Sequence, residues 1–292
     1  MKPKVMQHKN LRQFLADAGQ GLRKGPVGVI LAEDLVEIDS TIRHHLALGF
    51  TQLVVLAPQR LALAPILHDQ VHLVAHDLTQ ENAVQDAVNA ISEAAADQWV
   101  YYCYNAEYLF YPFCESRSVG EMLAFHTEER RDALLSYVID LYAADLTDHP
   151  LAVCLEEAYL DRSGYYALAR YDEANNPRER QLNFFGGLRW RFEEHIAEPR
   201  RKIDRISIFR AKPGLKLRSD HTFNDEEYNT YSCPWHHNIT IAIASFRTAK
   251  ALKANSGSTF EIPTFKWHNS IEFEWHSQQL LDLGLMEPGQ WF

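Results

Sequence analysis

Residues 97–113 read DQWVYYCYNAEYLFYPF, and this stretch decides how the rest of the chain is interpreted. Its first part, residues 99–102, predicts a strand, because aromatic and β-branched side chains fit a pleated and largely buried surface. The polar residues 105–107 (Asn-Ala-Glu) then separate two apolar runs. A strand that ends in an amide and a carboxylate places them where open α/β sheets bind ligands. These three residues are therefore the first candidate for a functional site.

Strand and helix patterns alternate upstream of this stretch. Short apolar runs bounded by turn residues predict buried parallel strands at 26–32, 52–57 and 71–75. Apolar residues at helical spacing predict helices at 11–18, 35–48, 61–67 and 82–96. The alternation predicts right-handed βαβ units and a mostly parallel sheet with helices on both faces.

The pattern changes after residue 113. A capping box formed by Ser118 and Glu121 predicts the start of a long helix that continues to Tyr142. Further along, the sequence predicts an exposed loop at 170–183, a strand at 203–209, a turn at 212–214 and a β-rich segment at 238–246 that either stays a strand or continues as a helix. We find no linker that separates two domains.

Composition excludes several classes of protein. Hydrophobic residues make up 46% and charged residues 23% of the 292 residues, which is typical of a globular protein. The net charge of -10 argues against a general nucleic-acid binder, which needs surplus cations to displace phosphate counterions. The first ten residues lack the apolar core of a secretory signal, and no apolar run is long enough to span a bilayer. The four cysteines show no Cys-x-x-Cys spacing, so we expect a cytoplasmic protein with reduced thiols and no transmembrane segment.

Three segments taken together resemble a family 2 glycosyltransferase of the GT-A fold. The strand and helix of residues 27–50 end in His44-His-Leu-Ala-Leu-Gly-Phe50, where that family often has Tyr-His-x-x-Leu-Gly-Phe. The segment Tyr104-Asn-Ala-Glu-Tyr-Leu109 stands where the family has Asp-Ala-Asp-Glu-Phe-Leu. Later segments, residues 185–187, 202–209 and 235–237, are similar to the acceptor-side half of the same proteins.

The resemblance implies a single GT-A-like α/β domain, with a mostly parallel, Rossmann-like sheet flanked by helices. Residues 26–118 would form the nucleotide-sugar-binding half, and residues 119–292 the long helix and an α+β acceptor-side half. The implied activity is transfer of a hexosyl unit from a nucleotide-diphosphate sugar to a glycan or polysaccharide acceptor. In that family an Asp-x-Asp motif holds Mn²⁺ or Mg²⁺, which stabilises the departing diphosphate.

This chain departs from the metal-binding motif. Alignment on residues 107–109 places Tyr104 and Ala106 where the two aspartates would stand. Asn105 and Glu107 are then the oxygen donors of the motif, so they are the predicted metal ligands, with His237 as an additional late ligand. The open alternative is structural: Asn105 caps a turn and Glu107 pairs with an arginine.

The other predicted site residues come from three places in the chain. Glu33 follows the first strand and is expected to face the nucleotide. Arg189 and Trp190 follow the pair Gly186-Gly187 and could bind a phosphate and stack on a sugar or base; alternatively the glycines form a turn and Trp190 lies in the core. Asp225 or Glu226, with Glu227 as a third option, could deprotonate the acceptor hydroxyl, although a solvated acidic turn also explains them.

Two rival functions remain from other classes of protein. The first is a degenerate GT-A-like protein that binds a glycan or a protein partner without turnover, because both aspartates of the motif are missing. The second is a metalloenzyme that uses His221, His236 and His237, although their spacing matches no zinc signature.

Overall fold

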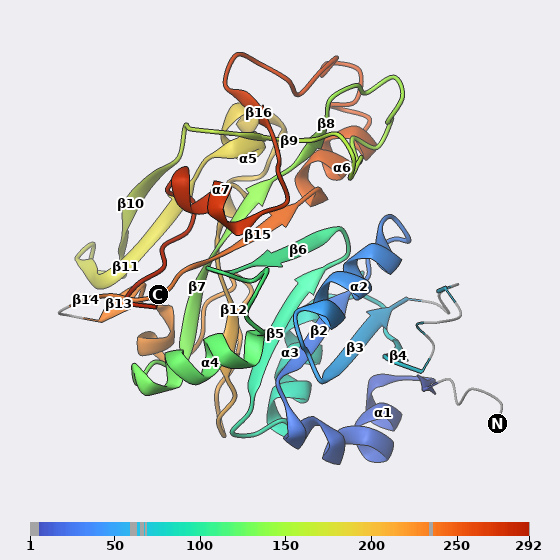
Figure 1. Cartoon of the computed structure of the whole chain (residues 1–292), viewed down its shortest axis with the longest axis vertical. Helices are drawn as coiled ribbons and strands as arrows, with labels where there is room; N and C mark the ends of the chain where they lie inside the picture. The colour runs from blue at the N-terminus through green and yellow to red at the C-terminus, as the bar shows by residue number, and fades with distance from the viewer. Residues whose placement is uncertain (1–5, 59–62, 65–66, 68, 234–235, 292) are drawn as a thin grey trace. The chain divides into compact units, whose positions relative to one another are not determined.

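The computed structural model describes residues 6–58, 63–64, 67, 69–233 and 236–291 (Figure 1). It has a mixed α/β architecture with a large, mostly parallel central sheet flanked by helices. The chain forms two compact units, each made of three separate stretches: Met1–Ala106, Ser116–Leu134 and Ile206–Asn229 in unit 1, and Glu107–Glu115, Leu135–Arg205 and Thr230–Phe292 in unit 2. Within the described residues, no helix is long and apolar enough to cross a membrane.

Unit 1 is built on strands in the order β1-β4-β3-β2-β5-β12. Their bounds are Gln7–His8 (β1), Val27–Leu31 (β2), Gln52–Ala57 (β3), His72–Ala75 (β4), Trp99–Tyr104 (β5) and Asp204–Arg210 (β12, most of which belongs to this unit). The strands from β1 to β5 pair in parallel, and β12 runs antiparallel to β5. The predicted strands at 26–32, 52–57, 71–75, 99–102 and 203–209 are confirmed, and the fourth extends to Tyr104. The sequence did not indicate the short strand β1.

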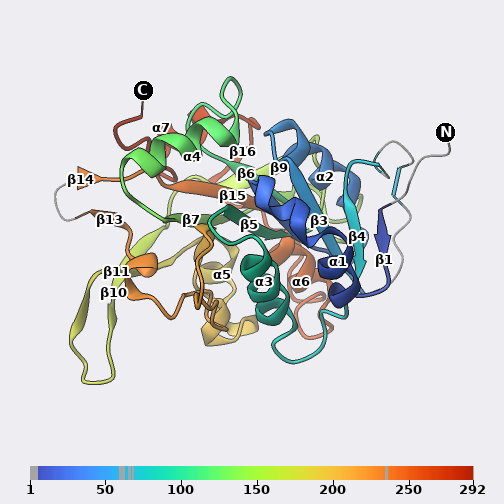
Figure 2. The same cartoon turned by 90° about the horizontal axis from the view of Figure 1, so that it is seen from below.

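Helices cover both faces of these strands. Their bounds are Leu11–Ala18 (α1), Ile38–Ala47 (α2), Ala83–Ala94 (α3) and Val119–Glu128 (α4), with 3-10 turns Gly19–Lys24 (η1) and Glu226–Asn229 (η5). Figure 2 shows α2 on one face of β3 and α1 with α3 on the other. The predicted helices at 11–18 and 82–96 are confirmed, and the one predicted at 35–48 begins later, at Ile38. The short helix predicted at 61–67 lies largely outside the described residues.

The long helix predicted from 119 to 142 is wrong in its second half. The capping box at Ser118 and Glu121 starts α4 as expected, but the helix ends at Glu128. Arg130 has a φ of 57°, and its N–H donates to the carbonyl of Thr127 at 2.9 Å. This left-handed residue ends the helix, because it turns the chain away from the helix axis. Residues Ala133–Asp140 then form a strand, β7.

Unit 2 contains the strands β7, β15 (Ile241–Ser245) and β6 (Glu107–Phe110) in the order β7-β15-β6. β15 is parallel to β7 and antiparallel to β6. The β-rich segment predicted at 238–246 therefore forms a strand, at Ile241–Ser245, before α6 begins. The other elements of the unit are the strands β8 (Tyr142–Ala143), β9 (Ala158–Asp161), β10 (Tyr166–Tyr171), β11 (Pro177–Phe185), β13 (Ser232–Cys233), β14 (His236–His237) and β16 (Ser270–Glu272), the helices α5 (Gly187–Arg191), α6 (Arg247–Ala254) and α7 (Ser277–Asp282), and the turns η3 (Glu193–His195) and η4 (Glu198–Arg200).

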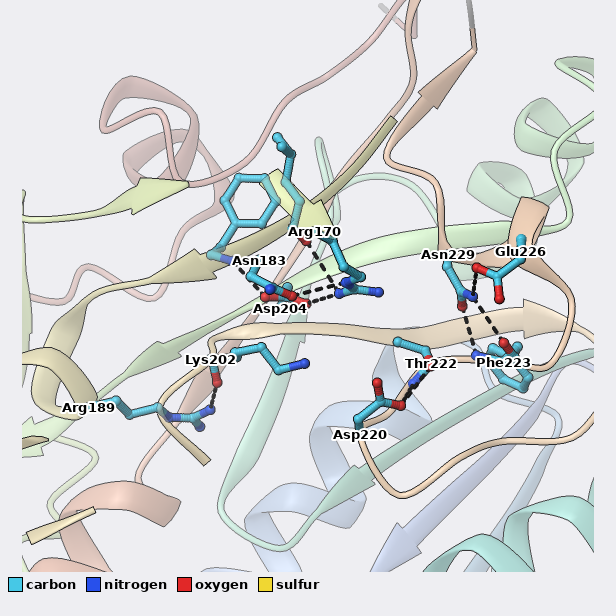
Figure 3. A network of polar contacts seen from close by, with 12 residues as sticks. Arg170, Asn183, Arg189, Lys202, Asp204, Asp220, Thr222, Phe223, Glu226 and Asn229 are labelled. Carbon is cyan, nitrogen blue, oxygen red and sulfur yellow. Dashed lines mark hydrogen bonds and ion pairs between the residues drawn. The ribbon is translucent and has the colours of Figure 1, made fainter. Parts of the chain in front are cut away.

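Residues 170–183, predicted as an exposed loop, instead belong to a hairpin. β10 and β11 pair antiparallel, with Tyr166 opposite Phe185, and the turn between them spans residues 172–176. The turn falls at the predicted Asn-Asn-Pro. An ion pair anchors the hairpin: Arg170 Nη2 lies 3.0 Å from the buried Asp204, which also accepts the Phe184 N–H at 2.7 Å (Figure 3). The polar residues that suggested a loop are therefore part of an ordered two-stranded sheet.

Candidate functional site

The carboxyl ends of β2 and β5 meet in unit 1 and carry the first group of candidate residues. The two strands pair in parallel, with Leu31 opposite Tyr104, so the residues that follow each strand lie at the same edge. Glu33 N–H donates to Asn105 Oδ1 at 2.9 Å. The structure therefore brings together Glu33 and Asn105, which are 72 residues apart in the chain.

Asn105 is fully buried, and both its amide nitrogen and its amide oxygen have hydrogen-bond partners. Its Nδ2 donates to Asp34 Oδ1 at 2.6 Å and to the carbonyl of Val36 at 2.9 Å. Its Oδ1 accepts from the backbone of Glu33. A buried amide needs such partners, because an unsatisfied polar group would cost free energy. Asn105 thus holds the loop between β2 and α2 in place, which is the turn-capping role that the sequence left open.

Asp34 is the site residue that sequence reasoning missed. Its Oδ1 accepts the Val36 N–H at 2.8 Å as well as the Asn105 amide. Glu33 and Asp34 are both exposed. Two neighbouring carboxylates at the end of a buried strand could have pointed to this residue. Together with Asn105 they form what we call the strand-end cluster: Glu33, Asp34 and Asn105.

The next residue, Ala106, has a φ of 58° and a buried backbone N–H that donates to Thr41 Oγ1 at 2.9 Å. Thr41 Oγ1 in turn donates to the carbonyl of Glu37 at 2.6 Å. Both contacts tie the end of β5 to the first turn of α2. Asn105 and Ala106 are therefore held in place by hydrogen bonds to the β2–α2 loop and to α2.

Glu107 belongs to unit 2 and is fully buried in β6. Its Oε2 lies 2.6 Å from Arg205 Nη2, and its Oε1 accepts from Ser245 Oγ at 3.1 Å. Both partners are buried, so the carboxylate neutralises a cation that would be costly to leave unpaired. This is the arginine pairing that the sequence left open for Glu107.

The expected divalent metal requires free oxygen donors at this place. Asn105 has committed its amide to the β2–α2 loop, and Glu107 has committed its carboxylate to Arg205. His237 is well exposed on β14, with Nδ1 at 3.8 Å from Glu287 Oε2. In the described part of the chain, no group of three His, Cys, Asp or Glu side chains could hold a metal ion. In this arrangement Asn105, Glu107 and His237 do not fit a metal site, so we derive no step through a metal.

The predicted base residues line a hollow in unit 1 with a volume of about 410 Å³. Its walls are Lys212, Pro213, Gly214, Leu215, Asn224, Asp225 and Glu226. Lys212 Nζ hydrogen-bonds to Asp225, and this contact lowers the pKa of the Asp225 carboxyl. Glu226 accepts from Arg218 at 3.3 Å. It also accepts from Asn229 at 3.3 Å (Figure 3). The structure therefore brings Asp225 and Glu226 to one hollow, although each carboxylate already has a cationic neighbour.

Glu227 pairs with a different cation. Its Oε1 lies 2.7 Å from Nη1 of Arg131, which is buried.

The loop that carries Glu227 also carries His221, whose Nδ1 lies 2.9 Å from Tyr102 Oη. His221 and Tyr102 are also stacked, with ring centroids 5.9 Å apart. In unit 1 His221 thus packs against β5. His236 lies on β14, and the structure does not describe its side chain.

The glycine pair before α5 packs against protein side chains. A Cβ at Gly186 would lie 2.2 Å from the Tyr165 ring, and a Cβ at Gly187 would lie 3.0 Å from Asp140 Oδ2. The Arg189 N–H donates to Asp140 Oδ2 at 3.3 Å, and its guanidinium donates to the carbonyl of Lys202 at 2.6 Å. Burial raises the pKa of Asp140, and the charge of Arg189 opposes this effect.

Arg189 and Trp190 therefore differ in their surroundings. The Arg189 side chain is 13% exposed and pairs with Asp140, with Nε at 3.4 Å from Oδ1. Trp190 is 42% exposed and lies over Gly164, where a Cβ would meet its ring at 3.4 Å. Of the two alternatives for Trp190, the one that places it in the core is wrong. An exposed aromatic ring of this kind remains available for stacking.

Comparisons with known proteins add no assignment to this geometry. No protein-family model matches the chain, and no curated protein matches it.

Proposed function

We propose that the protein is a glycosyltransferase-like protein that binds a nucleotide-diphosphate sugar at the carboxyl ends of β2 and β5 and transfers its hexosyl unit to a glycan acceptor. The observation that carries this proposal is the strand-end cluster. One buried amide, that of Asn105, fixes the Glu33 backbone and the Asp34 carboxylate at adjoining ends of parallel strands, and both Glu33 and Asp34 are exposed. Open α/β sheets bind ligands at such ends, where loops leave room for them.

The charge of the cluster favours one part of the ligand. Carboxylates accept hydrogen bonds, so Glu33 and Asp34 suit the hydroxyls of a ribose and the N–H groups of a base. The same charges repel a diphosphate. We therefore expect the cluster to bind the nucleoside. The acceptor hydroxyl would lose its proton to Glu226 or Asp225, which line the hollow beside η5.

Isothermal titration tests this proposal with UDP, GDP and their hexose derivatives, each with and without Mn²⁺. We expect binding of one nucleotide, weakened about tenfold by Glu33→Gln or Asp34→Asn, which corresponds to about 1.4 kcal/mol. Both substitutions remove a charge and keep the shape of the side chain. Glu81→Gln, a change at another exposed carboxylate of unit 1, serves as the matched control. If no nucleotide binds the wild-type protein, the proposal is wrong.

A second candidate is favoured by the contacts of Asn105 and Glu107. Both groups of the altered motif have protein partners, and Asp225 is paired with Lys212. These contacts suit a GT-A-like protein that binds a glycan or a protein without turnover. Such a protein needs no group that changes its protonation state or releases a diphosphate.

The two candidates differ in the response to restoring the motif. Tyr104→Asp combined with Ala106→Asp supplies the two missing carboxylates. At Ala106 the φ of 58° suits Asp better than Ala. A gain in Mn²⁺-dependent nucleotide affinity would support a donor pocket that is otherwise intact. An unchanged affinity, with no release of nucleotide from any sugar donor, would support the candidate without turnover.

A further inference from the structure

Two histidines connect the N-terminal strand to the sheet of unit 1. His8 on β1 and His72 on β4 approach each other, with Nε2 of His8 at 3.3 Å from Nδ1 of His72. Both rings pack against Phe14 of α1, each with its centroid 5.1 Å away. The pair is thus a defined contact between three elements, and the proposed nucleotide site does not use it.

The strand that this contact holds is short. β1 consists of Gln7 and His8, which pair with Leu73 and Val74 of β4. One further hydrogen bond runs from the Leu73 N–H to the carbonyl of Met6 at 2.8 Å. Two residue pairs provide little free energy of their own, because a short edge strand orders its backbone for few hydrogen bonds. The side-chain contact between His8 and His72 therefore contributes a large share of what keeps β1 in place.

We propose that His8 and His72 form a pH-sensitive latch that holds β1 on β4 at neutral pH and releases it in acid. A neutral pair keeps its bond, because the N–H of one ring faces the bare nitrogen of the other. A pair with one added proton keeps a single N–H donor and one acceptor. The second proton leaves two N–H groups and two positive charges facing each other, so the bond is lost and the rings repel.

The surroundings of the pair determine when this occurs. Asp17 of α1 faces the pair, and its Oδ2 lies 4.0 Å from His8 Nδ1. The titratable groups that β1 and β4 contribute are His8 and His72 themselves. Burial lowers the pKa of His8, and the Asp17 carboxylate partly offsets this. Burial and the neighbouring His8 lower the pKa of His72. Both imidazoles are thus neutral at pH 7, and the latch opens below the ordinary histidine pKa of about 6.5.

Release of β1 changes what the edge of β4 offers. The Leu73 N–H loses its partner at Met6, and the backbone groups that β1 had covered become open to water or to another strand. The Leu73 amide is therefore the direct reporter of the latch.

Hydrogen exchange of the full-length protein, read at the Leu73 amide as a protection factor, tests the latch. Protection factors correct for the dependence of chemical exchange on pH. We expect the wild-type factor to fall about tenfold between about pH 7.5 and about pH 5.5, where histidines gain protons. The amides of β2 and β5 should stay better protected than Leu73 over the same range, because they open only with the whole protein.

His72→Gln and His8→Gln each remove one of the two titrating rings, so each should reduce the dependence of Leu73 protection on pH. The double variant should abolish that dependence. His268→Gln, which changes an exposed histidine of unit 2, should keep the wild-type response. Three results would overturn the proposal: constant protection in the wild type, a wild-type response in both latch variants, or equal protection of Leu73 and the amides of β2 and β5 in acid.

Discussion

Glu107 stabilises the protein through the arginine that it neutralises. Its carboxylate lies 2.6 Å from Arg205, and both side chains are almost fully buried. Glu107→Gln removes the negative charge and leaves the guanidinium paired with a neutral amide in the interior. We expect the free energy of unfolding to fall by about 3 kcal/mol, the usual cost of breaking a buried pair by changing one partner. Urea denaturation monitored by circular dichroism measures this change.

Two further variants separate the charge from the shape of the side chain. Arg205→Met in the Glu107→Gln background removes the cation that has lost its carboxylate, so part of the lost stability should return. Glu81→Gln, at an exposed carboxylate, should change the free energy of unfolding by less than about 0.5 kcal/mol. If Glu107→Gln behaves like this control, Glu107 does not neutralise Arg205 as the structure indicates.

For individual residues, the sequence predicted where the polar side chains lie in the chain of strands and helices, but it did not predict what they contact. Asn105 stands out because it is polar between apolar runs, and its place at the end of a strand is confirmed. Its partner Asp34 is 71 residues away, and Arg205 is 98 residues from Glu107. Such partners depend on how strands are ordered in the sheet, which hydrophobic patterns do not specify.

The end of α4 illustrates how a single backbone conformation sets the length of an element. Arg130, which is exposed, has a φ of 57°, and the following Arg131 N–H donates to the carbonyl of His126 at 3.3 Å. Glycine adopts this conformation without the strain that a side chain brings. We therefore expect Arg130→Gly to raise the free energy of unfolding by about 0.5–1 kcal/mol, measured by urea denaturation.

The same substitution inside the helix provides the comparison. Glu128→Gly, at the last residue of α4, should lower the free energy of unfolding by about 1 kcal/mol, because glycine is a poor helix former. A loss of stability in Arg130→Gly would show that the left-handed residue does not terminate the helix favourably.

Arg130 also explains why part of the fold escaped prediction. Residues 133–140 are almost entirely buried, and a short apolar run of this kind fits a buried strand as well as a helix. A glycine at position 130 would have marked the boundary, whereas arginine gives no such indication. The strands of unit 1 were predictable because glycine or proline stands next to several of them. The β10–β11 hairpin was missed because residues 170–183 are mostly polar and, of the side chains on its two strands, only Gln181 is buried.

Acid should destabilise the whole protein, and His126 is a major reason. Its Nε2 lies 3.0 Å from the carbonyl of Ala133, and burial lowers the pKa of His126 to about 4. Below pH 6.5 the unfolded chain therefore binds a proton that the folded protein does not. Stability is lost as the pH falls from about 6.5 to about 4, by roughly 3 kcal/mol at 1.36 kcal/mol for each pKa unit.

Urea midpoints measured from about pH 7.5 to about pH 4.5 test this expectation. His126→Gln keeps a donor for the Ala133 carbonyl and cannot titrate, so its stability should depend less on pH than that of the wild type. His268→Gln should keep the wild-type dependence. Buried Asp140 and Asp204 act in the opposite direction, since burial raises the pKa of each carboxyl. An identical pH dependence in the wild type and His126→Gln would contradict the role of His126.

The interleaving of the two units has a consequence for how the protein is made. Unit 1 ends with the stretch Ile206–Asn229, and unit 2 begins with Glu107–Glu115. During translation, β12 of unit 1 emerges only after most of unit 2 has been synthesised. The ribosome therefore cannot release one finished unit before it starts the next, as it does for domains encoded one after another. β12 is synthesised about a hundred residues after β5, its antiparallel partner. Until then, the edge of β5 that pairs with β12 must wait in the nascent chain without this strand.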